Sequence, residues 1–197
     1  LHTQTPKGSR DVARLPKGRG TGIANLSPAR NILLDLFWRN ARGFDESFVT
    51  PNCPNTDPLY LYIENGMVHE PANQRHKRST LPNLGGKWLW DNDEGWKAPG
   101  YDFMNADLLF YQKTKQFIEE HRAENADMPF FAVLSTQIAH APVLPAAEFN
   151  NATKAGPRGD FVWELDVLVG RVLDLVENLG IDENTLVIFN ADNGAEP

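Results

Sequence analysis

The pattern of apolar and polar residues is clearest in the second half of the chain, where it predicts alternating helices and strands. Residues 160–179 carry apolar side chains at steps of three and four, and Gly180 suits the end of a helix. A weaker helical pattern covers residues 105–121. Short apolar runs of strand length follow at residues 130–134 and 185–189. This order predicts a parallel α/β layer whose two strands are neighbours or near neighbours, joined by the longer helix as a right-handed crossover.

The first 100 residues lack this regularity. Residues 1–30 are rich in Gly and basic residues, a combination that can bind phosphate, but no strand before them or helix after them supports that function. Residues 43–99 contain many Pro, Asn and Gly residues, and the apolar run at residues 59–63 predicts a short strand or hairpin. Long excursions of this kind often shape the wall of an active site. We therefore expect residues 1–100 to form an irregular wall beside a β-α-β core segment at residues 101–197.

Composition narrows the class of protein. With 197 residues and 41% hydrophobic content, the chain suffices for one globular domain or for a large piece of a bigger one. Its net charge of −7 argues against a nucleic-acid partner, but not against an anionic substrate, because a metal ion reverses the local field. No apolar run is long enough to span a bilayer. No signal peptide is visible, although the start at Leu1 leaves export open. Cys53 is the only cysteine, which excludes an internal disulfide and a thiolate zinc site.

Candidate chemistry follows each of the two predicted strands. Asp192-Asn193 comes directly after the second strand and offers a charged and a neutral oxygen, which suit calcium or magnesium. The alternative is an ordinary Asn-Gly turn. His140 lies in the loop after the first strand, where the alternative is a histidine that is merely hydrogen-bonded within the loop. Because the carboxyl ends of parallel strands meet at one edge, we expect His140, Asp192 and Asn193 on one rim, within about 10 Å.

A series of short pieces, read in order, resembles the sulfatase family, specifically its arylsulfatase-like branch within the alkaline-phosphatase superfamily. The pieces extend from about residue 42 to the end of the chain, and their combination carries the resemblance. They are Arg42-Gly43-Phe44-Asp45, Tyr60-Leu61-Tyr62-Ile63-Glu64-Asn65, Ala98-Pro99-Gly100-Tyr101-Asp102, Pro129-Phe130-Phe131, Ala139-His140-Ala141-Pro142, Gly156-Pro157-Arg158-Gly159-Asp160-Phe161, Glu164-Leu165-Asp166, Val169-Gly170-Arg171-Val172-Leu173, Asn184-Thr185-Leu186-Val187-Ile188-Phe189 and Asp192-Asn193-Gly194.

The resemblance implies an α/β fold of the alkaline-phosphatase type, a sandwich with a mostly parallel central sheet flanked by helices. Residues 1–197 would form part of a single catalytic domain that hydrolyses sulfate esters, the sulfuric ester hydrolases of EC 3.1.6. In that family a cysteine oxidised to formylglycine attacks sulfur beside a calcium ion. By the same resemblance, Asp192 and Asn193 match calcium ligands, and His140 matches the catalytic histidine that binds the sulfate or the leaving oxygen.

Several of the family's motifs are missing from this chain. The nucleophile motif Cys-x-(Pro/Ala)-Ser-Arg is absent, and Cys53 lacks the Ser and Arg, so we interpret it as a structural thiol. The aspartate pair that supplies the other calcium ligands is absent as well. Gly86-Lys87-Trp88-Leu89 resembles the lysine-histidine motif but has Leu instead of His and lies on the wrong side of residue 42. These absences predict an internal fragment of a sulfatase that, by itself, is inactive and does not bind calcium tightly.

Two alternatives to a sulfatase stay open. The first is a phosphate or phosphonate ester hydrolase of the same superfamily, and the second is a non-catalytic relative that kept the scaffold. The expected partner is a small-molecule or glycan sulfate ester, with no nucleic acid and no membrane-spanning segment. The family is usually exported to the periplasm, the extracellular space or the lysosome. The sequence does not determine the oligomeric state.

Overall fold

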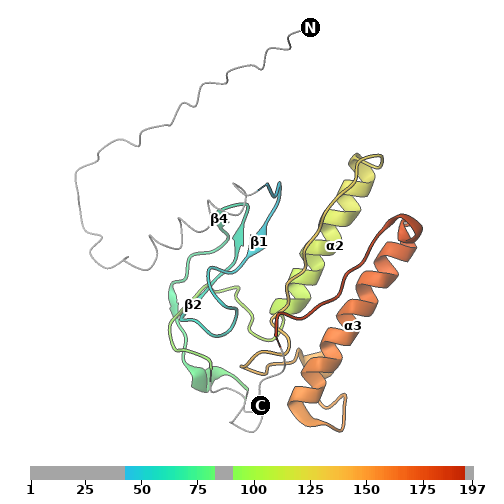
Figure 1. The fold of residues 1–197 in the computed structure, drawn as a ribbon. Coiled ribbons are helices and arrows are strands. Elements are labelled where there is room, and N and C mark those ends of the chain that lie inside the picture. Colours follow the sequence, from blue (N-terminus) through green and yellow to red (C-terminus); the bar gives the residue numbers. More distant parts are fainter. Residues whose placement is uncertain (1–42, 83–90, 194–197) are drawn as a thin grey trace, which may run out of the picture.

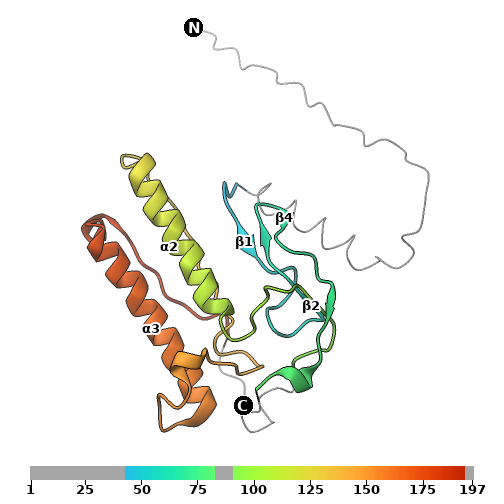
Figure 2. The ribbon, with the colours of Figure 1, turned by 180° about the vertical axis from the view of Figure 1, so that it is seen from behind.

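The computed structural model describes residues 43–82 and 91–193 of the chain. Figure 1 shows two parts, with small sheets and irregular loops on one side and a pair of long helices on the other. The same division appears from behind in Figure 2. The loop predicted at residues 1–30 lies outside the described residues. The expected division into an irregular wall at residues 1–100 and a β-α-β core segment at residues 101–197 stays a prediction.

The first small sheet is an antiparallel unit built around one hairpin. Its strands are β1 (Phe48–Val49), β3 (Ile63–Glu64) and β4 (Met67–Val68), in the order β1-β3-β4. Asn65 and Gly66 connect β3 to β4 with φ angles of 49° and 79°. Asn-Gly is the dipeptide that accepts positive φ at both central positions of a tight hairpin turn. The strand or hairpin predicted near residues 59–63 therefore exists, with its turn set by local sequence.

The second small sheet joins segments that are further apart in the sequence. It consists of β2 (Leu59–Tyr60), β5 (Gln74–Arg75) and β6 (Trp96–Lys97), in the order β2-β6-β5. The β2 and β6 strands are parallel, whereas β5 and β6 are antiparallel. Gly95 sits directly before β6, where an added Cβ atom would lie 2.0 Å from the Pro58 carbonyl oxygen. A larger residue at this position would push the two parallel strands apart. The 3₁₀-helix η1 (Arg78–Thr80) follows β5.

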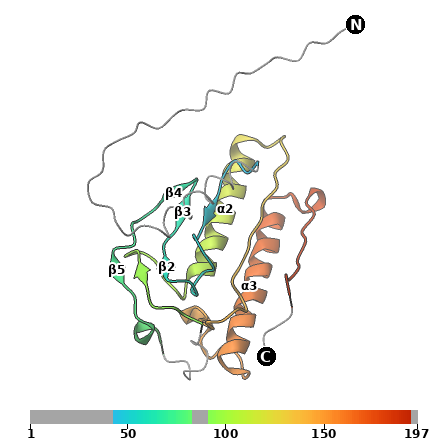
Figure 3. The same cartoon turned by 60° about the vertical axis from the view of Figure 1, so that its left-hand side comes forward.

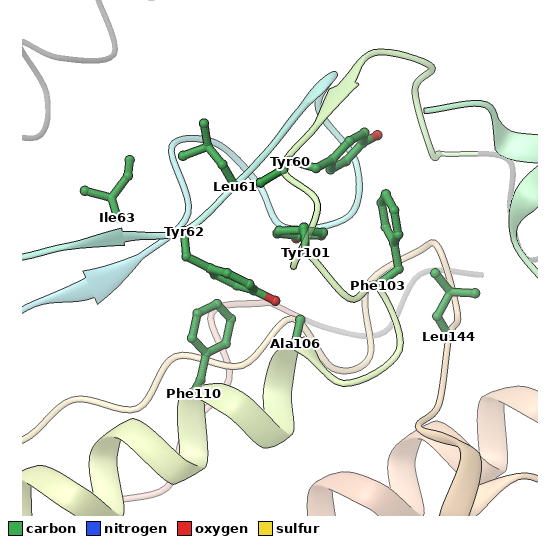
Figure 4. Close-up of a cluster of buried hydrophobic side chains, with 10 residues drawn as sticks. Tyr60, Leu61, Tyr62, Ile63, Tyr101, Phe103, Ala106, Phe110 and Leu144 are labelled. Carbon is green, nitrogen blue, oxygen red and sulfur yellow. The ribbon is translucent and has the colours of Figure 1, made fainter. Parts of the chain in front are cut away.

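An aromatic core unites both sheets with the start of the first long helix (Figure 4). Tyr62 stacks on Tyr101 with ring centroids 4.7 Å apart, and Tyr60 meets the edge of Phe103 at 4.6 Å. Offset and edge-on contacts of this kind add to the large apolar area that each ring buries. Phe110, from the first long helix, closes one side of the cluster.

The two long helices agree with the helical patterns in the sequence. The first, α2 (Ala106–Glu124), was expected at residues 105–121, and the second, α3 (Gly156–Asn178), at residues 160–179. Gly180 ends α3 with a φ of 62°, which confirms the predicted stop. The two helices pack side by side, as Figures 1 and 3 show. Short 3₁₀ turns, η3 (Ala147–Phe149) and η4 (Asp182–Asn184), flank α3, and neither α2 nor α3 is apolar enough to cross a membrane.

The two strands predicted at residues 130–134 and 185–189 are not confirmed. Both segments are extended and run in the same direction, opposite to α3 (Figures 1 and 2). Neither belongs to a sheet of the described residues, so the mostly parallel central sheet is not confirmed either. Strand assignment requires a hydrogen-bonded neighbour, which apolar β-branched composition alone does not supply. Most of their apolar side chains are exposed, with Leu186 at 84%, although Leu134 is partly buried against the aromatic core.

Candidate functional site

His140 projects from a loop that is largely buried on its C-terminal side. Its backbone N–H donates to the Gln137 carbonyl at 2.7 Å, and residues 141–146 that follow are all buried. The peptide bonds Ile138–Ala139 and Ala141–Pro142 on either side of His140 are cis. The His140 side chain itself is half-exposed. The loop therefore presents a partly exposed imidazole on an otherwise packed segment.

Two contacts orient the Nδ1 side of the His140 imidazole. Its Nδ1 donates to the Ala141 carbonyl, because a carbonyl oxygen only accepts. The same nitrogen lies 3.8 Å from Oδ2 of Asp91, close enough for an ion pair when the ring is protonated. Contacts at Nδ1 orient the ring, and an imidazole in a fixed orientation is a common general acid. Asp91 was not among the residues that the sequence singled out, and nothing in its local pattern distinguishes it.

Two buried carboxyls lie beneath this loop, and the sequence pattern did not select either of them. Asp107, in the first turn of α2, accepts the Gln137 N–H at 2.9 Å, while Glu164, inside α3, accepts the Ala146 N–H at 2.9 Å. Their exposed fractions are 1% and 0%. One signal was available for Glu164, because it follows Phe161 by three positions and so shares a helix face with the buried side chains.

Burial also changes the acidity of these two carboxyls. Burial raises the pKa of Asp107 to about 7, although hydrogen bonds from Gln137 lower it. Burial likewise raises the pKa of Glu164 to about 7, against the hydrogen bond from Ala146 and with a further increase from nearby Asp107. Desolvation disfavours the charged form of a carboxyl, so both groups hold a proton more readily than they would in water.

Asp192 and Asn193 lie at the end of the described chain. The backbone N–H and the side-chain amide of Asn193 donate to the Asp192 carboxylate at 2.9 and 3.2 Å, and both residues are exposed. This local pairing is also what a simple turn would show. Gly194, the third residue of the motif, lies outside the described residues. The described geometry is thus compatible with either the metal-ligand or the turn interpretation.

The donor chemistry of this pair fits calcium in type but not in number. Carboxylate and amide oxygens are the ligands that a hard cation prefers, and calcium takes roughly six to eight of them. Within residues 43–82 and 91–193, no group of three or more His, Cys, Asp or Glu side chains is placed to hold a metal ion. Asp192 and Asn193 would therefore supply only part of a coordination shell.

The remaining sequence candidates are Cys53 and the segment 86–89. Cys53 is exposed, and its carbonyl accepts the Thr56 hydroxyl at 3.1 Å within a turn. Its interpretation as a structural thiol stays a prediction. The segment 86–89 lies outside the described residues.

Figures 1 and 2 show that the loop after residues 130–134 and the extended segment after α3 both return to the end of the helix pair where α2 and α3 begin.

Comparison with known proteins identifies the family. Residues 38–197 match the sulfatase family. Over 166 residues the chain is 40% identical to N-acetylgalactosamine-6-sulfatase from Mus musculus, covering 78% of this chain and 26% of that protein. It is 29% identical over 184 residues to N-acetylgalactosamine-6-O-sulfatase from Bacteroides thetaiotaomicron, covering 77% of this chain and 34% of the relative. It is 40% identical over 74 residues to human arylsulfatase A, covering 38% of this chain and 15% of that enzyme.

The fold of the chain is also similar to that of a solved structure. It comes from work on the metabolism of multiple glycosaminoglycans by Bacteroides thetaiotaomicron and superimposes with a TM-score of 0.56 at 22% identity. The match covers 75% of this chain and 36% of that structure. This likeness supports the α/β class, although the chain spans only about a quarter to a third of the relatives it matches. Because the family match extends over residues 38–197, the chain belongs to the sulfatase family.

Proposed function

We propose that the protein containing this chain hydrolyses sulfate esters, and that its substrate is a glycan carrying 6-sulfated N-acetylgalactosamine. The family match over residues 38–197 carries the reaction class, and His140, Asp192 and Asn193 lie within that range. The substrate class rests on the extent of the relatives' matches. The N-acetylgalactosamine-6-sulfatases match 77–78% of the chain, whereas arylsulfatase A matches 38%.

In this proposal His140 acts on the oxygen that leaves sulfur. As the S–O bond breaks, negative charge builds up on the bridging oxygen, and an imidazole N–H aimed at that oxygen stabilises it more in the transition state than in the ground state. Contacts of Nδ1 with Ala141 and Asp91 hold the ring in one orientation. The imidazole is therefore assigned to substrate binding and to proton donation.

Asp192 and Asn193 are the proposed ligands of a calcium ion. A cation bound there would supply electrostatic stabilisation of charge on the sulfate oxygens. In this proposal, oxygens from outside the described residues complete the coordination shell of the calcium ion. A formylglycine nucleophile, also from outside the described residues, attacks sulfur beside it. The 197-residue chain alone is expected to be inactive and to bind calcium weakly, because two ligand residues are too few.

The test is hydrolysis by the full-length protein, produced with a formylglycine-generating enzyme. A 6-sulfated N-acetylgalactosamine oligosaccharide, a chromogenic aryl sulfate and the matching aryl phosphate are compared. We expect sulfate release from the oligosaccharide with kcat/KM at least about tenfold above that for the aryl sulfate, since contacts to the sugar add transition-state binding. Faster hydrolysis of the aryl phosphate would favour the phosphate-ester alternative. No turnover by a protein shown to carry formylglycine would favour the non-catalytic scaffold.

A further inference from the structure

The loop that carries His140 is tied at both ends to buried carboxyls on two different helices. Asp107 of α2 accepts the N–H of Gln137 at 2.9 Å, and Glu164 of α3 accepts the N–H of Ala146 at 2.9 Å. Both side chains are essentially inaccessible to solvent. The helix pair thus determines where residues 137–146 begin and where they end.

Between these two ties, the path of the loop leaves His140 little freedom. The His140 N–H donates back to the Gln137 carbonyl, so Gln137 lies between Asp107 and His140 in one chain of hydrogen bonds. Further along, Leu144 is fully buried in the aromatic core, where Figure 4 shows it beside Phe103. A shift of Gln137 would therefore move His140 directly.

Burying these two carboxyls in this position lowers the stability of the folded protein. Oδ2 of Asp107 and Oε1 of Glu164 are buried and have no hydrogen-bond partner among the described residues. A buried polar atom without a partner destabilises the protein, so such atoms in a folded protein call for an explanation. An ordinary loop anchor does not require this arrangement, as Asp160 demonstrates. Asp160 uses both carboxylate oxygens on the amides of Asn151 and Thr153, at 2.9 and 2.7 Å.

We propose that Asp107 and Glu164 are positioning residues that place His140 for catalysis. They hold the loop through hydrogen bonds and act on the substrate through His140, so this inference rests on the proposed function. Because only an oxygen acceptor is needed, the neutral amides Asn and Gln should preserve the effect, whereas Ala should abolish it.

The experiment compares Asp107→Ala, Asp107→Asn, Glu164→Ala and Glu164→Gln in the full-length protein. Asp160→Ala is the matched control, because Asp160 also anchors a loop from α3 but not the loop of His140. We expect Asp107→Ala and Glu164→Ala to lower kcat on the order of 10- to 100-fold with KM within about twofold, since small misplacements of a catalytic group have effects of this size. Asp107→Asn and Glu164→Gln should recover kcat to within about threefold of wild type by the same reasoning.

Hydrogen–deuterium exchange provides a readout that does not depend on turnover. Exchange at the amides of residues 137–140 should accelerate in Asp107→Ala and stay unchanged in Asp160→Ala. If wild type shows no sulfate hydrolysis, the proposed function fails, and unchanged exchange in Asp107→Ala would then separately refute the anchoring. Equal losses of kcat in Asp107→Ala and Asp160→Ala would also overturn the proposal, as would amide variants no better than their alanine counterparts. If the alanine variants do not fold, Asp107→Asn and Glu164→Gln test the proposal. A kcat near that of wild type is expected in them, and a kcat far below it would contradict the proposal.

Discussion

The two parts of the described chain bury their apolar side chains to different extents. In the first part, Tyr60 and Ile63 are buried in an aromatic cluster that draws on both small sheets. In the second part, the extended segments around Phe131 and Phe189 leave most of their apolar surface exposed, 75% and 66% for these two rings. Both kinds of segment have the composition of strands. Composition therefore favours an extended backbone, but the burial of an extended segment depends on a neighbouring segment that the sequence pattern does not specify.

The two parts also differ in whether their buried polar groups have hydrogen-bond partners. In the first part, Asn92 donates to the Asn55 carbonyl at 2.7 Å and its oxygen pairs with the His76 ring at 2.7 Å. Every buried group in this small network has a partner, which fixes the aromatic core. In the second part, Asp107 and Glu164 each keep one buried oxygen unpaired. The unpaired buried oxygens therefore lie beneath the loop of His140, whereas the polar network of the first part is fully paired.

The largest expected effect tests whether the second part carries the chemistry. In the full-length protein, Asp192→Ala should raise the barrier to sulfate hydrolysis by several kcal/mol and reduce bound calcium, because it removes a charged ligand of the ion. The exposed acids Asp166 and Asp174 on α3 are matched controls, whose Ala variants should cost less than about 1 kcal/mol. Activity and calcium content are measured for each variant. Wild-type values in Asp192→Ala would establish the Asn-Gly turn interpretation instead.

The next largest effect tests the core of the first part. Phe103→Ala in the 197-residue chain should lower the free energy of unfolding by about 3–5 kcal/mol, because it leaves a cavity among Tyr60, Tyr101 and His76. Urea denaturation followed by tryptophan fluorescence measures the change. A loss under about 1 kcal/mol would mean that the cluster is not a real core.

His140→Ala should separate the imidazole from the metal ligands. We expect turnover by the full-length protein to fall about 100-fold, the contribution typical of a positioned proton donor, with calcium content unchanged. Steady-state kinetics and metal analysis of the same preparation provide both numbers. If calcium content fell together with turnover, His140 would belong to the metal site rather than to substrate binding.

The pH dependence of stability should combine opposite contributions from the two parts. Asp107 and Glu164 have folded pKa values of about 7, above their ordinary range, so the stability they contribute is present below about pH 4 and is lost as pH rises towards 7. Burial lowers the pKa of His76 below 6.5, so its contribution is present above that pH and is lost as pH falls. Because two acids oppose a single imidazole, we expect the melting temperature to decline between pH 4 and 7.

The double variant Asp107→Asn/Glu164→Gln isolates one of these opposing effects. It removes both acids, so its melting temperature should no longer decline between pH 4 and 7, and the loss at low pH from His76 should remain. Thermal unfolding of the full-length protein and the double variant across this range provides the comparison. Parallel curves for the two proteins would mean that the buried acids have ordinary pKa values.

The smallest expected effect concerns an exposed ring. Phe189→Ala in the 197-residue chain should change the free energy of unfolding by no more than about 0.5 kcal/mol, as for other surface substitutions. The same denaturation assay and the same kind of substitution as Phe103→Ala make the two results directly comparable. A loss as large as that of Phe103→Ala would remove the contrast between the two parts.

Local sequence determined the elements whose hydrogen bonds are local. The apolar steps along residues 160–179 and the stop at Gly180 specified α3 to within a few residues, because helix bonds join positions four apart. Asn65-Gly66 specified the β3–β4 turn for the same reason. The series of motifs was also sufficient for the family, and it nominated His140, Asp192 and Asn193.

The tertiary structure alone decided everything that depends on distant residues. It left residues 130–134 and 185–189 extended but unpaired among the described residues, since a strand needs a partner that periodicity does not specify. It buried Asp107 and Glu164 beneath the loop of His140, although acidic residues on a helix usually face solvent. It also placed Asp91 beside the imidazole across 49 positions of sequence. Burial and pairing are properties of the packed chain, so only its three-dimensional arrangement determines them.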